Sequence, residues 1–391
     1  MKGIKVAIIA VMAALVMGLA GPGTAPATAA PGKTIKIGAV LNFTGAIAFI
    51  GPIFKRGIVQ ALEEANYQVG GRKIELIVED AGSDVTKTLE KVKKLVESDG
   101  VKIIIGPLMG DAQLAIAPYL KKKKVLISTL YCGDFSLTKY PNWLIYPTTL
   151  VGLTAPVGWY AADQGWKKMV TIGSDYAGGR GFIKGIKLGF EQKGGKVVQQ
   201  VWTPVGTKDY GPALSNVTKD ADCAAYFVPS PTEVMRFLPQ YHQFGIKLPL
   251  LGTTVAADMP ESIMKQLGKN VEGMVGQALY INTLDDPVNQ AFVKAMQKRF
   301  GKKPGGLENN SYCVTKAILA GLKATGGDDS FDKLRPAVLA SKLKTPQGPL
   351  SWGKEGIAVT NCYMAKATKK NGHWSWVPVK VYEAVRDPRL K

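Results

Sequence analysis

Strand and helix signals alternate along this chain, and this alternation constrains the fold more strongly than any other feature of the sequence. Residues 34–41 and 101–105 form short apolar runs of the kind found in strands that are buried on both faces. Residues 85–98 instead carry apolar side chains at a helical spacing. Strands separated by helices favour a parallel sheet with helices on its faces. The sequence therefore predicts an α/β fold.

The alternation starts again near residue 150, so two α/β units are expected. A length of 391 residues fits two units, because a domain has roughly 150 residues. The other expected strands span residues 73–79, 125–128, 168–172, 196–202, 223–228, 248–251, 273–280, 348–352, 362–366 and 375–382. The other expected helices span residues 52–67, 112–121, 152–164, 179–193, 232–244, 260–267, 287–300 and 310–325. A hairpin turn is expected at Gly372.

The first 29 residues have the composition of a secretory signal peptide. Lys2 and Lys5 precede an uncharged, mostly apolar run at 6–20, and small residues at 27–29 provide a cleavage pattern. The alternative is a membrane anchor, but the apolar run is shorter than the roughly 20 residues that a spanning helix needs. We therefore expect cleavage after residue 29 and a mature protein in the bacterial periplasm.

The chain is basic, with 50 Lys and Arg against 30 Asp and Glu. Such a balance can attract nucleic acid or an acidic membrane face. Here the lysines are scattered over many segments, and the one run, at 121–124, has no aromatic residues between its members. Because the chain also carries an export signal, no nucleic-acid partner is expected. We expect a monomer.

Patterns typical of catalysis or of cofactor binding are weak in this sequence. The two histidines, His242 and His373, have no obvious carboxylate or thiol partner, and neither a zinc-protease motif nor a phosphate-binding loop is present. The glycines at 179–185 follow a strand, but their spacing is one residue too long for a dinucleotide loop. We therefore predict no catalytic residue and no cofactor, which disfavours an exported enzyme.

The four cysteines stand at positions 132, 223, 313 and 362, and their spacing matches no metal motif. No metal site is therefore expected. Cys223 and Cys313 lie in apolar segments and are expected in the core. The periplasm permits disulfides, and the sequence leaves their pairing open.

Ligands of parallel α/β sheets bind beyond the carboxyl ends of the strands. The segments at such ends span residues 42–51, 107–111, 129–134, 174–179, 229–231 and 253–258. They combine small residues with hydroxyl groups and aromatic rings, a set that can bind and orient a solute. Turn formation or packing explains Gly110 and Ser230 equally well, whereas Tyr131 and Tyr176, each just beyond a strand, favour ligand contact.

Five segments together resemble a known family. They are KIGAVLNFTGAIAFIG at 36–51, KIELIVEDAGSD at 73–84, IIIGPLMGDAQLAIAP at 103–118, TIGSDYAGGRG at 171–181 and PLSW at 349–352. In order and spacing the chain resembles periplasmic substrate-binding proteins of ABC transporters, of the leucine/isoleucine/valine-binding protein type. The resemblance covers essentially the whole mature chain.

The resemblance implies a type I periplasmic-binding fold, in which two doubly wound parallel-sheet lobes are joined by a three-crossover hinge. The first lobe would comprise residues 34–150 plus 281–353, and the second would comprise 151–280 plus 354–391. A small-molecule ligand would lie between the lobes, and the partner would be a transporter permease in the inner membrane. A ligand-sensing receptor subunit of the same fold is the alternative.

Similar proteins hold the carboxylate of an amino acid on a serine at a helix start and on a threonine after the next strand. Gly110 stands at the serine position, so only its backbone N–H group can serve, and Asp111 follows it. Cys132 falls at about the threonine position. Leu130 and Tyr131 precede it, and Leu130 can offer backbone groups.

The other family positions differ as well. Tyr176 keeps a family tyrosine, whereas Ser230 replaces a second one. Thr254 replaces the acidic residue that meets the ligand ammonium group. Ile50 replaces an aromatic residue in the first loop, and Phe49 lies beside it.

These departures bear on the ligand. A threonine cannot neutralise a buried ammonium group, and an unpaired buried charge is costly. We therefore predict a small organic solute, such as an aromatic or another carboxylate, in place of a standard amino acid. The alternative is branched-chain amino acid binding proper, with Asp111 or Asp258 as the acidic partner.

Overall fold

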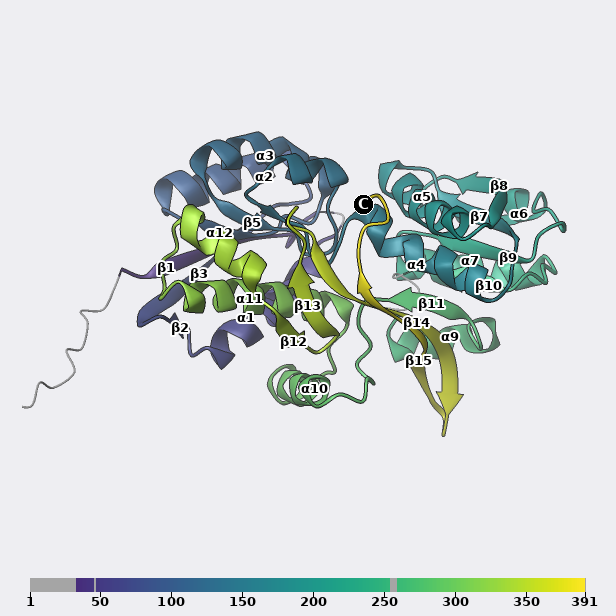
Figure 1. Ribbon diagram of the computed structural model, residues 1–391. Helices are drawn as coiled ribbons and strands as arrows, with labels where there is room; N and C mark the ends of the chain where they lie inside the picture. Colours follow the sequence, from purple (N-terminus) through teal and green to yellow (C-terminus); the bar gives the residue numbers. More distant parts are fainter. Residues whose placement is uncertain (1–32, 46, 254–258, 391) are drawn as a thin grey trace, which may run out of the picture.

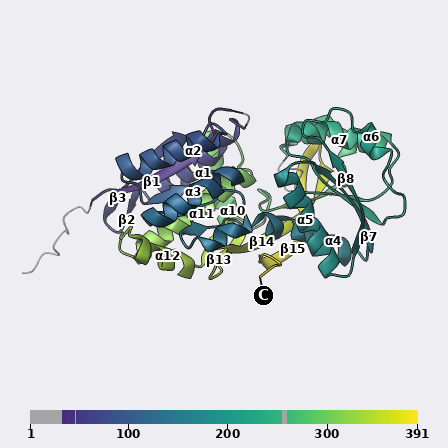
Figure 2. The same cartoon turned by 90° about the horizontal axis from the view of Figure 1, so that it is seen from above.

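The computed structural model describes residues 33–45, 47–253 and 259–390 and places them in two α/β lobes (Figure 1). The predicted fold class is confirmed. Seen from above, the lobes lie side by side, and β14 and β15 run along one side of the junction between them (Figure 2). The predicted signal peptide at 1–29 lies outside the described residues.

The first lobe is built on a six-stranded sheet in the order β2-β3-β1-β4-β5-β6. All neighbouring pairs are parallel except β2 and β3. Its strands are β1 (Ile35–Leu41), β2 (Gln68–Val69), β3 (Arg72–Asp80), β4 (Ile103–Ile105), β5 (Leu126–Ser128) and β6 (Trp143–Leu144). The helices between them are α1 (Ile50–Glu64), α2 (Val85–Lys93), η1 (Lys94–Ser98), α3 (Gly110–Lys123) and η2 (Phe135–Lys139).

The chain later returns to the first lobe as three helices, α10 (Pro287–Phe300), α11 (Gly306–Ala324) and α12 (Phe331–Ala340). Helix α11 packs closely against α1, because a Cβ at Gly57 would lie 2.2 Å from the carbonyl oxygen of Glu308. Arg56 and Glu308 form an ion pair of 2.6 Å across the same contact. The two helices therefore share one apolar core with the sheet.

The second lobe holds five parallel strands with helices on both faces. The strands are β7 (Lys168–Ser174), β8 (Lys196–Thr203), β9 (Cys223–Phe227), β10 (Leu250–Gly252) and β11 (Val275–Ala278). The helices are α4 (Leu150–Asp163), α5 (Ala177–Gln192), α6 (Gly211–Leu214), α7 (Pro231–Gln243), α9 (Glu261–Leu267) and η3 (Gly268–Asn270). The glycines at 179–185 serve packing, since a Cβ at Gly185 would meet the Thr154 hydroxyl at 2.1 Å.

Strand β14 (Ala358–Lys370) belongs to both lobes. Its first residues pair with β13 (Gly348–Trp352), which pairs in turn with β12 (Leu343–Thr345). Its middle pairs antiparallel with β11, and its end forms a hairpin with β15 (His373–Val385). Gly372 has a φ of 81°, so the hairpin turn predicted there is confirmed.

Several predicted boundaries are wrong. The helix predicted at 52–67 ends at Glu64, because Asn66 and Tyr67 have φ values of 50° and 49°, which no helix accepts. The strand predicted at 101–105 begins only at Ile103, and the one predicted at 362–366 is part of a much longer β14. Helix α12 was not predicted, because Pro336 interrupts its pattern.

The state of the cysteines and the character of the helices complete the description of the fold. Cys223 and Cys313 are buried, as predicted, and all four cysteines are free thiols. Across residues 33–45, 47–253 and 259–390, none of the helices has the length and the apolar content needed to cross a membrane.

Candidate functional site

The first-lobe side of the predicted site begins where β1 leads into α1. Phe49 precedes α1 and is 59% exposed, so its ring is available to a ligand. Ile50 is the first residue of α1 and packs against the core of the first lobe. The amide of Gly51 donates a 3.0 Å hydrogen bond to the carbonyl of Asn42, which holds the loop between them closed.

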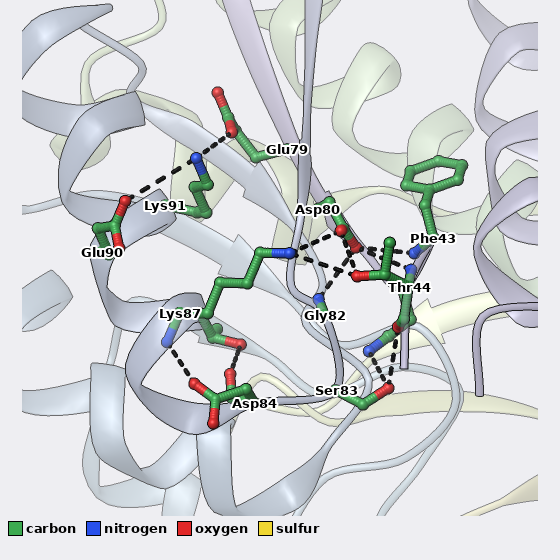
Figure 3. Close-up of polar contacts among 12 residues, drawn as sticks. Phe43, Thr44, Glu79, Asp80, Gly82, Ser83, Asp84, Lys87, Glu90 and Lys91 are labelled. Carbon is green, nitrogen blue, oxygen red and sulfur yellow. Dashed lines mark hydrogen bonds and ion pairs between the residues drawn. The ribbon is translucent and has the colours of Figure 1, made fainter. Parts of the chain in front are cut away.

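The carboxylate of Asp80, at the end of β3, fixes the start of this loop (Figure 3). It accepts hydrogen bonds from the amides of Phe43 and Gly82, at 2.9 and 3.0 Å, and from the hydroxyl of Thr44, at 2.6 Å. Lys87 pairs with it at 2.7 Å. Burial favours the neutral acid, but these hydrogen bonds outweigh it and hold the pKa of Asp80 well below its usual value. Asp80 therefore acts as a fixed anion that positions the loop leading to Phe49.

Gly110 and Asp111 lie at the start of α3, and both are exposed. The residue before them, Met109, is extended and makes no side-chain cap. The first backbone N–H groups of a helix have no partner within it and attract anions. The N–H groups at this helix start can thus donate hydrogen bonds to a carboxylate, although the negative charge of Asp111 repels such an anion.

Gln113 ties this helix start to the loop after β5. Its Nε2 lies within hydrogen-bond distance of the carbonyls of Pro107, Leu108 and Cys132, at 3.0, 3.1 and 3.3 Å. The side chain is buried, and its Oε1 has no partner among the described residues. Gln113 was not predicted from the sequence, where its only signal is a polar residue on an apolar helix face.

The loop after β5 brings Leu130, Tyr131 and Cys132 to the junction of the lobes. Leu130 is fully buried. Tyr131 packs against apolar clusters of both lobes, and Cys132 packs against a cluster of the second lobe. Burial, aided by the charge of Asp134, raises the pKa of Cys132 to about 12, so its thiol stays protonated and is a poor nucleophile.

Tyr176 supplies the facing aromatic group of the second lobe. It stands directly before α5, and 37% of it is exposed. Its ring lies 6.3 Å from that of Phe227, which stacks on Phe182 at 4.0 Å. Partial burial, with smaller contributions from Cys132 and Glu233, raises the pKa of Tyr176 to about 12. Tyr131, Cys132 and Tyr176 therefore lie around one largely aromatic cluster. Asp134 and Glu233 are close enough to influence Cys132 and Tyr176.

Ser230 caps helix α7. Its hydroxyl accepts a 3.2 Å hydrogen bond from the amide of Glu233. Glu233 is buried and accepts hydrogen bonds from the amide of Gly206, at 3.2 Å, and from the hydroxyl of Tyr210, at 3.4 Å. Glu233 was not predicted from the sequence, although Ser-x-x-Glu at 230–233 is a recognisable capping-box pattern.

The last predicted site segment follows β10. Thr253 is buried at the end of that strand. Thr254 and Asp258 lie outside the described residues, so their roles remain predictions.

Known proteins share this arrangement of two lobes. A family model described as periplasmic binding protein matches residues 34–372. The chain belongs to this family. This chain is similar to Leu/Ile/Val-binding protein homolog 6 of Brucella suis biovar 1 (strain 1330). The two are 28% identical over 375 residues, which are 93% of this chain and 96% of the relative.

Two solved structures share the fold over nearly the whole periplasmic binding protein. An ABC transporter substrate-binding protein from Sphaerobacter thermophilus has 28% identity and a TM-score of 0.87, covering 90% of this chain and 99% of its own. A solute binding protein of an ABC transporter from Rhodopseudomonas palustris BisB5, in complex with 3,4-dihydroxy benzoic acid, has 28% identity and a TM-score of 0.81. That alignment covers 91% of this chain and 99% of the other. The predicted resemblance to solute-binding proteins of ABC transporters is confirmed.

Proposed function

We propose that this periplasmic binding protein delivers a small aromatic carboxylate to an ABC transporter permease. One observation carries the proposal. Tyr131 and Cys132, from the loop after β5, pack against the second-lobe cluster that contains Phe227, and the ring of Tyr176 lies 6.3 Å from the Phe227 ring. Aromatic rings favour the faces and edges of other rings. The similar Rhodopseudomonas palustris protein was solved with 3,4-dihydroxy benzoic acid, which supports this ligand class.

The remaining predicted residues complete the proposed site. The open backbone N–H groups at Gly110 and Asp111 would donate hydrogen bonds to the ligand carboxylate, and Phe49 and Ile50 would cover the ring. Leu130, Ser230 and Thr254 are the other proposed contacts of the solute. The protonated thiol of Cys132 suits binding better than catalysis.

Calorimetric titration with 3,4-dihydroxybenzoate and with leucine tests the ligand class. We expect the aromatic acid to bind at micromolar concentration and leucine to bind far more weakly. Tyr131→Ala and Tyr176→Ala should each weaken the binding. Tyr140→Ala is the control, because its ring stacks under Lys121 at the far end of α3. Tight leucine binding would instead support the amino-acid alternative, which the name of the Brucella relative favours.

The proposed clamp consists of residues 34–150 plus 281–353 and residues 151–280 plus 354–391. A ligand that touches both lobes is held fully only in the closed form, so it shifts the population towards closure. Small-angle scattering should therefore show a smaller radius of gyration when the ligand is bound. An unchanged radius at saturation argues against the clamp.

We further propose that the protein acts in the periplasm as a monomer and binds no nucleic acid. A signal peptide is removed from the mature protein, so N-terminal sequencing of the periplasmic fraction should begin at Ala30. Recovery of the intact chain from membranes would contradict this.

A further inference from the structure

A second cavity, of about 510 Å³, lies between the lobes and is lined by none of the site residues described above. The first lobe contributes the loop at 302–306, between α10 and α11, and the second contributes the start of α9 and the beginning of β15. The chain passes from β11 of the second lobe to α10 of the first at 280–283, along the same cavity. A molecule held there would touch both lobes.

The first-lobe wall of this cavity is cationic. Lys302 and Lys303 both line it and are exposed, and neither has an ion-pair partner in the described part of the chain. The acid on the opposite wall, Glu261, is already engaged. It pairs with Lys265 at 3.0 Å and with His373 at 3.1 Å. The charge of the two lysines is therefore available to a ligand.

The second-lobe wall is aromatic and contains a polar group without a partner. Trp374 and Trp376 line the cavity and pack against the core of the second lobe. Within the described residues, the buried indole Nε1 of Trp376 and the buried hydroxyl of Tyr280, which also lines the cavity, have no hydrogen-bond partner. Buried polar groups nearly always have a partner in the protein, in water or in a ligand.

We propose that this cavity is a second binding site, which takes a small aromatic carboxylate. Lys302 and Lys303 pair with its carboxylate, and its ring lies against Trp374 and Trp376. Because such a ligand touches both lobes, it favours one angle between them and thereby changes the affinity of the first site. None of the residues that line this cavity belongs to the site of the proposed function, so the two sites can be tested separately.

Calorimetry on the full chain, with 3,4-dihydroxybenzoate as the probe at low ionic strength, tests the proposal. We expect two binding events. Lys302→Met combined with Lys303→Met should weaken one event at least about tenfold, as expected for the loss of hydrogen bonds to a charged group. The control is Lys122→Met combined with Lys219→Met, two exposed lysines elsewhere, and it should keep both events. The affected event should also change tryptophan fluorescence, and Trp376→Phe should reduce that change.

A single event in the unmodified protein that survives the combined lysine substitution would overturn the second site. Equal weakening in the control, or binding of benzylamine at the same place, would overturn it too, because the lysines would then not select an anion. Tyr131→Ala separates this inference from the proposed function. Loss of one event in that variant, with survival of the lysine-dependent event, supports two distinct sites. If the only event in the unmodified protein needs the lysines, the proposed first site fails and the cavity is the one ligand site.

Discussion

The hydroxyl of Tyr363 donates a 2.8 Å hydrogen bond to the main-chain carbonyl of Gln347, and this bond joins the lobes at the hinge. Gln347 lies between β12 and β13, whereas Tyr363 lies where β14 pairs with β11. The Gln347 side chain also accepts hydrogen bonds from the hydroxyl of Tyr146, at 3.1 Å, and from the amide of Asn309. Tyr146 belongs to the first of the three crossovers between the lobes, and β14 belongs to the third. Gln347 therefore connects two of these crossovers.

Tyr363→Phe removes this bond and keeps the ring. We expect the free energy of unfolding to fall by about 1 kcal/mol, the usual net value of a neutral hydrogen bond, since the Gln347 carbonyl stays buried. Urea unfolding measures the change. Tyr160→Phe is the control, because the Tyr160 hydroxyl makes no hydrogen bond within the described residues. Equal stability of the two variants would show that the hinge bond contributes nothing.

Asp80→Asn should destabilise the protein by about 1.5–3 kcal/mol at neutral pH, the range for hydrogen bonds to a charged group. The folded pKa of Asp80 is lowered, so its contribution is complete above the unfolded value of about 4 and is lost as the pH falls further. The difference between variant and unmodified protein should therefore shrink below about pH 4. Denaturant unfolding at neutral and at acidic pH measures it, with the exposed Asp111→Asn as control. A difference that does not depend on pH would contradict the role of the charge.

The features that the sequence predicts well are those set by local spacing. Residues 35–41 and 103–105 form strands because their apolar runs are short and β-branched, and Gly372 turns because it tolerates a positive φ. The spacing of the glycines at 179–185 does not match a dinucleotide loop. They allow α4 and α5 to pack closely.

The contacts that the sequence could not predict join segments far apart in the chain. Glu233 binds Gly206 and Tyr210, which lie 27 and 23 residues away. The length of β14 depends on three partner strands, β11, β13 and β15, which no local pattern reveals. Residues 49–50, 110–111, 130–132 and 176 were placed at strand ends by a general rule, and their ligand contacts remain predictions.

Tyr176→Phe tests the hydroxyl of the proposed site. We expect a loss of affinity for an aromatic carboxylate of about threefold to tenfold, the value of one hydrogen bond. Because the pKa of Tyr176 is raised to about 12, the hydroxyl stays protonated, and affinity should hold steady from neutral pH to about pH 10. Calorimetry across this range measures both effects. A fall in affinity that follows the titration of an ordinary tyrosine would contradict the raised pKa.

Gly185→Ala should cost about 1–3 kcal/mol of stability, as overpacking does, because its Cβ would meet the Thr154 hydroxyl and the Val151 carbonyl at 2.1 and 2.7 Å. Gly110→Ala is the matched control, because nothing lies within 4 Å of a Cβ there. Thermal unfolding of the two variants compares them. A stable Gly185→Ala variant would show that α4 and α5 can move apart freely.

Gln113→Leu should affect the ligand site more than the fold. The substitution keeps the side chain's volume but removes the amide that holds the carbonyls of Pro107, Leu108 and Cys132 together. Buried groups left without a partner cost about 1–3 kcal/mol each, and the two loops would separate to recover water. We therefore expect weaker binding of 3,4-dihydroxybenzoate together with a loss of stability of that size. Calorimetry and urea unfolding measure both quantities, with the exposed Gln297→Leu as control. Unchanged affinity in a destabilised Gln113→Leu variant would show that these loops do not form the ligand site.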